Sequence, residues 1–226
     1  MTTFVLVHGA WHGPWAWEKV TPFLHRAGAH TLVPNLRDGD VGLREHVEDV
    51  VTALGTAPDD VVLVGHSYAG LVVREAADLR PDRVAHIVLV DGWAGPDGSG
   101  MFTLAPDAFV QTVRSWADGA QVPAPPPAAF GITDPGEAGR LVPRLRPQPL
   151  RTFTDTTRLA GAVDRIPGTA VYCRPQSFPF DRFGKALGYR TLGLDGPHNV
   201  MLTHPEPLAQ LLLDTAGDFE NKKPAP

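Results

Sequence analysis

The sequence predicts a single α/β domain, with a mostly parallel sheet of six strands and helices on both faces. The chain has 226 residues, of which 43% are hydrophobic, and this is enough for one well-filled core. Short apolar runs alternate with stretches of helical period, which indicates strands and helices in turn along the chain. Most of these runs are uninterrupted, as expected for strands buried on both faces. The predicted strands are Phe4–Val7, His30–Pro34, Val61–Gly65, Ala85–Val90, Thr169–Cys173 and Arg190–Leu194.

Helices are predicted in the intervals between these runs. The clearest is Gly42–Leu54, because its apolar residues recur at i, i+3, i+4 and i+7 while charged residues occupy the other face. Two more are expected at Ser67–Leu79 and Glu206–Phe219, the latter followed by a flexible tail over residues 221–226. Residues 1–92 and 166–220 are therefore expected to form the core.

Residues 93–165 interrupt this alternation. Proline is dense in the stretch and no strand pattern is recognisable, yet the stretch is too long for an ordinary connection. We therefore expect a helical cap, inserted after the fourth core strand and lying over a binding pocket. A disordered linker is the alternative, but the aromatic residues of the stretch favour a folded segment. These aromatics are Phe102, Phe109, Trp116, Phe130 and Phe153.

The charge distribution argues against nucleic acids and membranes as partners. The formal net charge is -5, and it is spread without long runs of one sign. A small neutral or modestly polar molecule is the expected substrate, and assembly into a homodimer is left open. The single cysteine, Cys173, cannot form an internal disulfide, and the first apolar run is too short for a signal peptide or a membrane span. The expected location is the cytoplasm.

The strongest chemical signal is the segment Gly65-His66-Ser67-Tyr68-Ala69-Gly70, between a predicted strand and a predicted helix. A serine on a sharp strand-to-helix turn, with small residues beside it, is a nucleophile elbow. Gly65 and Ala69 supply the small residues. The turn presents the Ser67 hydroxyl at a helix N-terminus, where the backbone N–H of Tyr68 points at a developing oxyanion. The simpler interpretation is a serine that caps an ordinary helix.

A second oxyanion donor is expected from the loop after the first strand, His8-Gly9-Ala10. In sheets of this kind that loop curls beside the elbow, so the Ala10 N–H is the second contact and Gly9 permits the close approach. A metal site at His8 and His12 is the alternative. It is disfavoured because no Asp, Glu or Cys cluster accompanies the two histidines, so no metal is expected.

The expected general base is His198, which follows the last predicted strand in Leu194-Asp195-Gly196-Pro197-His198-Asn199. A serine nucleophile that precedes its histidine in the chain is the order associated with an elbow of this type. The Gly-Pro pair makes a turn that carries the imidazole over the elbow. The simpler interpretation is a histidine on the surface.

Three segments together resemble the small α/β-hydrolases grouped with plant methylesterases and hydroxynitrile lyases, and their bacterial esterase relatives. These segments are Phe4 to Trp17, Val62 to Gly70 and His198 to Pro205. The resemblance spans nearly the whole chain and is weakest in residues 93–165. It implies an α/β-hydrolase fold with a six-stranded core, a helical cap, a Ser-His-acid triad and no cofactor.

The sequence departs from this family pattern at two places. The lyases use a lysine directly after the catalytic histidine to handle cyanide, and this chain has Asn199, which cannot hold a positive charge. In most of the family the triad acid follows the fifth core strand, where no carboxylate is present here. Asp91, directly after the fourth strand, occupies a place that other α/β-hydrolases use for the acid. Asp181 is the second choice, and a structural carboxylate is the other interpretation of Asp91.

The sequence thus predicts a serine hydrolase that cleaves a small apolar or aromatic carboxylic ester through an acyl-enzyme. Two alternatives remain: a non-hydrolytic enzyme of small-molecule biosynthesis, such as a cyclase, an elimination enzyme or a C–C lyase, and a small-ligand-binding protein without turnover. The expected substrate-binding residues are Trp11, Trp93, Phe102 and Trp116.

Overall fold

The computed structural model describes residues 2–58 and 60–220, and these residues contain a six-stranded, all-parallel sheet of order β2-β1-β3-β4-β7-β8. All six predicted strands are present, each within two residues of its predicted bounds. The predicted α/β architecture with a six-stranded sheet is therefore confirmed, and the sheet is parallel throughout. The strands are β1 Thr3–Val7, β2 His30–Leu32, β3 Val61–His66, β4 Val84–Val90, β7 Gly168–Arg174 and β8 Arg190–Asp195.

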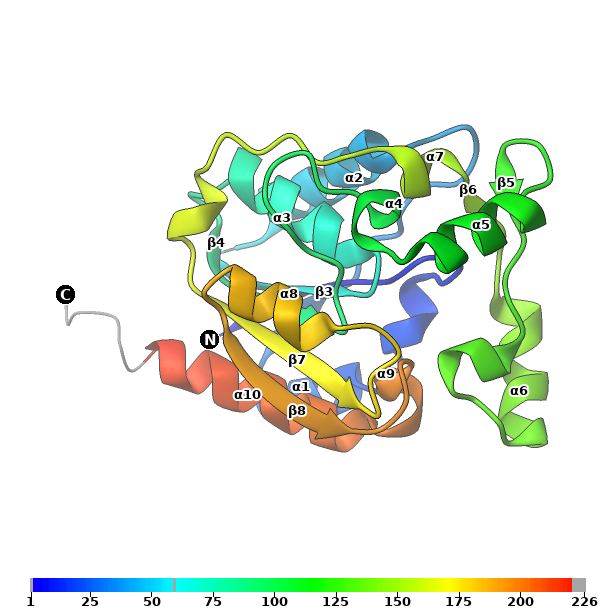
Figure 1. The fold of residues 1–226 in the computed structure, drawn as a ribbon. Coiled ribbons are helices and arrows are strands. Elements are labelled where there is room, and N and C mark those ends of the chain that lie inside the picture. Colours follow the sequence, from blue (N-terminus) through cyan, green and yellow to red (C-terminus); the bar gives the residue numbers. More distant parts are fainter. Residues whose placement is uncertain (1, 59, 221–226) are drawn as a thin grey trace.

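Uninterrupted apolar strands form because alternate side chains enter two different cores. In β1, Phe4 and Leu6 pack on one side of the sheet, whereas Val5 and Val7 pack on the other. The face of Phe4 is covered by α1 Thr21–Arg26 and α10 Pro205–Glu220. The opposite face is covered by α2 Leu43–Thr56, α3 Ala69–Leu79 and α8 Phe180–Ala186 (Figure 1).

The predicted helix boundaries hold with one instructive shift. The helix expected from Gly42 begins at Leu43, and the final helix begins at Pro205. The helix expected from Ser67 begins only at Ala69, because Ser67 and Tyr68 form the turn that leads into it. The predicted tail, residues 221–226, lies outside the described residues.

The segment between β4 and β7 is folded, and it contains a short antiparallel ribbon that the sequence did not predict. Its prolines seemed to exclude strands, but Pro149 pairs with Gln121 at the ribbon's end, where its missing N–H costs nothing. In Figure 1 this green segment extends toward the side at which the arrowheads of β7 and β8 point. Its elements are α4 Met101–Leu104, α5 Asp107–Trp116, β5 Gln121–Val122, α6 Pro135–Leu141, β6 Gln148–Pro149 and α7 Arg151–Thr154.

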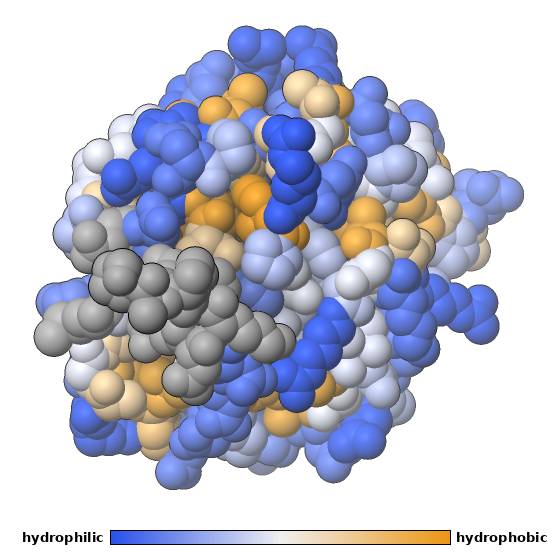
Figure 2. Space-filling view, turned by 90° about the vertical axis from the view of Figure 1, so that its left-hand side faces the viewer, coloured by the Kyte–Doolittle hydropathy of each residue, from blue (hydrophilic) through white to orange (hydrophobic). Residues whose placement is uncertain are grey.

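Short single-turn helices complete the described chain. They are η1 Pro14–Trp17, η2 Pro127–Phe130, η3 Val142–Arg144, η4 Val163–Arg165 and α9 Val200–Thr203. The molecule seen from the left of Figure 1 is mostly hydrophilic, with apolar residues in small separate patches (Figure 2). Across residues 2–58 and 60–220, none of the helices has the length and apolar character needed to cross a membrane.

Candidate active site

The predicted elbow is a tight turn at the carboxyl end of β3. Ser67 has a φ of 53°, a left-handed conformation that costs free energy for a residue other than glycine. Hydrogen bonds hold it there: its N–H donates to Val90 O (3.0 Å), and its carbonyl accepts from Trp93 N (3.0 Å). A Cβ at Gly65 would lie 2.7 Å from Ala69 O, so only glycine fits at that position.

The second close approach occurs at Gly70 and not at Ala69, the small residue that the motif emphasised. A Cβ on Gly70 would lie 2.4 Å from Trp93 O. The chain leaving β4 therefore passes directly against the first turn of α3. This packing brings the ends of β3 and β4 together, and with them the residues that follow each strand.

Ser67, His198 and Asp91 form a continuous hydrogen-bonded line. His198 Nε2 lies 3.0 Å from Ser67 Oγ, and His198 Nδ1 lies 2.9 Å from Asp91 Oδ2. Because an ionised carboxylate only accepts hydrogen bonds, Nδ1 carries the proton and Nε2 is free to accept the Ser67 proton. The ring of Phe180 stacks on the imidazole, with centroids 5.6 Å apart, and this limits its rotation.

Asp91 reaches His198 because its backbone turns sharply at the end of β4. Its φ is 42°, and its side chain is 1% exposed. Its second oxygen, Oδ1, accepts from Cys173 N at 2.7 Å, so both oxygens of the buried carboxylate are satisfied. Burial raises the pKa of the adjacent Cys173 thiol, which makes it a poor nucleophile.

Asp181, the second choice for the acid, is directed elsewhere. It lies in the first turn of α8, where its carboxylate accepts from Lys185 at 2.7 Å, one helical turn away. The hydrogen bond from Lys185 holds the Asp181 pKa below its usual value. Within the described residues it makes no hydrogen bond to His198, so the geometry gives this carboxylate no part in the site.

The loop after β1 lies against the elbow, as predicted. A Cβ on Gly9 would lie 2.9 Å from His66 Nδ1 and 3.0 Å from Ser67 Cβ, so the approach requires glycine. Neither the Ala10 nor the Tyr68 N–H donates a hydrogen bond within the part of the chain that the structure describes.

His8 and His12 each bond a carbonyl of the loop with one ring nitrogen and a group outside the loop with the other. His8 Nδ1 donates to Gly9 O (3.0 Å), while its Nε2 accepts from Leu36 N (3.3 Å). His12 Nδ1 donates to Ala10 O (2.7 Å), while its Nε2 accepts from the Asn199 amide (2.9 Å). Burial lowers the pKa of His8 to about 3 and that of His12 to about 4, so both rings are neutral at pH 7. These bonds employ both nitrogens of each ring, and the described residues contain no cluster suited to a metal.

An apolar cavity of about 300 Å³ opens beside Ser67 and His198. Three of the four predicted binding residues line it, namely Trp11, Trp93 and Trp116. The complete lining is Trp11, Ser67, Trp93, Met101, Phe109, Thr112, Val113, Trp116, Pro125, Ala129, Phe130, Ser177, Phe178 and His198.

The prediction that Phe102 lines the pocket is wrong. Its neighbour in α4, Met101, faces the cavity, and Phe102 packs on Phe153 (ring centroids 5.9 Å apart) beneath the guanidinium of Arg114. Two adjacent residues on a short helix point in different directions, and the sequence did not give the helix phase.

Other pocket residues were missed although a signal existed. Phe109 and Val113 precede the predicted Trp116 in α5 at a spacing of i, i+4 and i+7, which marks one face of a helix. Phe178 follows β7 in a loop without periodicity, and no pattern pointed to it. Asn199, noted only for the charge it lacks, is fully buried beside His12.

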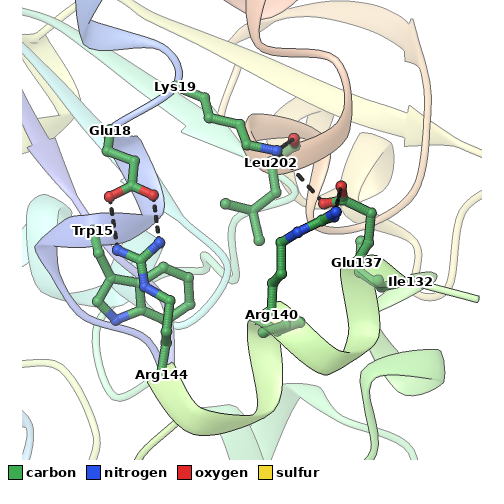
Figure 3. Close-up of a pocket in the computed structure, with 9 residues that line it drawn as sticks. Trp15, Glu18, Lys19, Ile132, Glu137, Arg140, Arg144 and Leu202 are labelled. Carbon is green, nitrogen blue, oxygen red and sulfur yellow. Dashed lines mark hydrogen bonds and ion pairs between the residues drawn. The ribbon is translucent and has the colours of Figure 1, made fainter. Parts of the chain in front are cut away.

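A second, smaller cavity of about 120 Å³ lies away from Ser67, between α6 and η1 (Figure 3). Two ion pairs cross the gap: Arg144 donates twice to Glu18 and lies over the Trp15 ring, and Lys19 forms an ion pair with Glu137. Within α6, Arg140 also donates to Glu137. Exposed pairs of this kind contribute little individually. Together the two pairs that cross the gap join the inserted segment to the core.

The described fold and this arrangement of side chains define a class of hydrolytic enzymes, and the comparison with known families agrees. The chain belongs to the alpha/beta hydrolase family, whose model matches residues 4–211.

The most informative relatives are esterases. A carbendazim hydrolyzing esterase from Nocardioides sp. (strain SG-4G) is 30% identical over an alignment of 239 positions, which covers 94% of this chain and 98% of that protein. Methylesterase 8 from Arabidopsis thaliana is 34% identical over 126 residues, which cover 50% of this chain and 46% of that protein. The predicted resemblance to methylesterases and bacterial esterases is confirmed.

Among solved structures, an extracellular alpha/beta-hydrolase from a Paenibacillus species superposes with a TM-score of 0.86 at 21% identity, covering 95% of this chain and 98% of that one. It is described as sharing structural and functional homology with tobacco Salicylic Acid Binding Protein 2. At this identity the likeness concerns the fold.

Proposed function

We propose that this protein is a serine hydrolase that cleaves small apolar or aromatic carboxylic esters through an acyl-enzyme. The observation that carries the proposal is the Ser67–His198–Asp91 line at the wall of an apolar cavity. The esterase relatives support the reaction class.

In the proposed mechanism, His198 Nε2 takes the Ser67 proton as the hydroxyl attacks the ester carbonyl. The Ala10 and Tyr68 amides donate to the oxyanion that develops. When the C–O bond breaks, the alcohol leaves with the proton from His198. A water molecule, deprotonated by the same imidazole, then attacks the acyl-Ser67 ester. The bond between the acyl carbon and Ser67 Oγ breaks, His198 returns the proton to Oγ, and the acid leaves. Asp91 holds the Nδ1–H tautomer and stabilises the charged imidazolium.

The lining of the cavity supports an apolar or aromatic substrate. His198 is its one ionisable side chain among the described residues, and aromatic rings form much of its wall. A substrate with a free carboxylate or ammonium group would lose hydration without finding an ion pair. We also propose that residues 93–165 act as the cap over this cavity, because five of its lining residues come from α4 and α5.

The structure gives no support to the two alternative functions, a non-hydrolytic enzyme and a binding protein without turnover. The non-hydrolytic reading depended on the missing acid after β7, and Asp91 now lies at hydrogen-bond distance from His198. A binding protein without turnover would be favoured by a disrupted set of reacting groups, but His198 lies within hydrogen-bond distance of both Ser67 and Asp91. The buried amide of Asn199, directly after His198, also disfavours cyanide release. A cytoplasmic location remains part of the proposal and rests on the lone, buried Cys173, whereas assembly into a homodimer stays open.

The proposal is tested by labelling and turnover measured on the same preparation. The wild-type chain should react with a fluorophosphonate probe and hydrolyse aryl esters, whereas Ser67→Ala should do neither. If the three residues act as a unit, kcat should fall by up to about a millionfold. Melting curves must show that the variant remains folded. Ester hydrolysis by a folded Ser67→Ala protein would disprove the acyl-enzyme.

A further inference from the structure

The residue after the expected oxyanion donor has an unfavourable backbone. Among described residues other than glycine, positive φ values occur at Ser67, Asp91 and Trp11, and Trp11 has the largest, 64°. A bulky side chain in this conformation persists only where its surroundings enforce it. Trp11 is therefore held by something outside its own loop.

The inserted segment between β4 and β7 supplies the hydrogen bonds that hold Trp11. Its N–H donates to Gln148 Oε1 (3.0 Å), its carbonyl accepts from Arg146 N (3.0 Å), and its indole N–H donates to Val122 O (3.0 Å). Gln148 and Val122 belong to the ribbon of β5 and β6. The ring also packs on Phe153, with centroids 5.3 Å apart.

These contacts fix the two peptide units on either side of the Ala10 Cα. In the unit before it, Gly9 O accepts from His8 Nδ1, and the N–H of a trans peptide points opposite to its carbonyl. The Ala10 N–H is therefore directed away from His8. In the unit after it, Ala10 O accepts from His12 Nδ1 and Trp11 N donates to Gln148. Among the described side chains of the inserted segment, Gln148 bonds directly to one of these two peptide units, whereas the Arg146 guanidinium donates to the carbonyl of His12 and contacts His8 Nε2.

The orientation of the Gln148 amide is determined by its neighbours. The Thr152 hydroxyl donates to Pro149 O (2.7 Å), so its oxygen must accept from Gln148 Nε2 (2.8 Å). The amide nitrogen thus faces Thr152, and the amide oxygen must face Trp11 N–H. Gln148 is 6% exposed and Thr152 is fully buried, so water does not compete for these bonds.

We propose that Gln148 is a positioning residue for ester hydrolysis, acting through Trp11 to aim the Ala10 N–H at the oxyanion. The inference rests on the proposed function, since it assigns the Ala10 amide to the developing charge. It makes the inserted segment a support for the catalytic step in addition to a wall of the pocket. Gln148 itself does not line the cavity or contact the substrate.

The test compares Gln148→Met, which keeps the length of the side chain but removes the acceptor, with Gln148→Asn, which keeps an amide but withdraws it by one methylene. Loss of a whole oxyanion donor costs about a hundredfold to a thousandfold in kcat. A misaimed donor should cost less, about tenfold to a hundredfold, with KM for the same aryl ester little changed. The matched control is Leu141→Ala, another buried substitution in the inserted segment, which should leave kcat near the wild-type value.

A second measurement separates aim from general stability. Ser67 adds to the carbonyl of a trifluoromethyl ketone inhibitor, and the adduct carries an oxyanion where the ester's oxyanion develops. The inhibition constant of the ketone should therefore rise in step with the fall in kcat/KM. An unchanged kcat in either folded variant, or a raised KM with unchanged kcat, would overturn the inference. If Gln148→Met does not fold, Gln148→Asn decides. Failure of the proposed function gives a different result, because wild-type protein would then not hydrolyse esters or Ser67→Ala would still do so.

Discussion

The loops at the ends of the strands and the segment between β4 and β7 build the site in different ways. The strand-end loops hold Ser67 and Asp91 in left-handed backbone conformations, each fixed by bonds to a neighbouring strand or loop. The inserted segment presents Phe109, Val113 and Trp116 from one face of a short helix. We infer that the sheet supplies the reacting groups while the inserted segment selects what reaches them.

The largest expected effect lies on the sheet side of this comparison. Asp91→Asn should lower kcat by about a thousandfold to ten-thousandfold, because an amide can donate to Nδ1 and favour the wrong imidazole tautomer. Asp181→Asn, the matched change in α8, should stay within a few-fold of wild type. Turnover of one good ester and a melting curve for each variant give the result. Equal losses of kcat in the two variants, or no loss in Asp91→Asn, would contradict the assignment of Asp91 as the triad acid.

An intermediate effect is expected in the inserted segment. Trp116→Ala opens the cavity wall and should change the preference between short and long acyl groups by about tenfold, the range expected for a few methylenes in an apolar pocket. Phe102→Ala should leave that preference intact and lower the melting temperature, because its ring packs on Phe153. The kcat/KM ratios for a series of aryl esters test both variants. If Phe102→Ala changed the ester preference and Trp116→Ala did not, Phe102 and not Trp116 would contact the substrate.

The smallest expected effect concerns the two buried histidines of the loop after β1. His8 and His12 have pKa values of about 3 and about 4, with burial as the first cause and the charge of Arg146 a further one. Their stabilising contribution is complete above the unfolded-state pKa of 6.5 and is lost as pH falls toward 4, because the unfolded chain binds the protons. Each of the two histidines should lower the free energy of unfolding by about 0.7 kcal/mol between pH 7 and pH 6.

Melting curves across that range measure this loss directly. The two histidines together contribute a fall of about 3 to 5 °C in melting temperature between pH 7 and pH 6. His46 and His66, whose pKa values burial also lowers, add to the fall in the same direction. His12→Gln, which removes one titrating ring, should show a shallower dependence than wild type. A melting temperature that rises as the pH falls would contradict the assignment of neutral rings.

The strand-end half of the site could be predicted from the sequence because it depends on local patterns. An apolar run, a turn and a helix specify Ser67, and chain order specifies His198. Asp91 required more, since a carboxylate after a strand has structural roles as well. Its sharp turn and its bond to Cys173 N come from strand pairing, which a single sequence does not reveal.

The inserted half depends on contacts between residues far apart in the sequence, and here prediction succeeded only partly. Trp116 and Phe102 looked equivalent as aromatics, but only one faces the cavity. Gln148 gave no signal, because a glutamine beside prolines is ordinary and its partner, Trp11, precedes it by 137 residues. The ribbon that carries Gln148 was missed for the same reason.

Placing Asp91 at the end of β4 has a consequence for how such an enzyme can diversify. In the proposed triad the acid is Asp91, so the loop after β7, where the resemblance to the family would place the acid, carries none and instead contributes Ser177 and Phe178 to the cavity. If the proposed triad is correct, insertions or substitutions from Pro175 to Phe178 can reshape the binding site while Asp91 stays at the end of the neighbouring strand β4. In a laboratory evolution experiment on ester preference, substitutions in this loop should be tolerated and should recur among the selected variants.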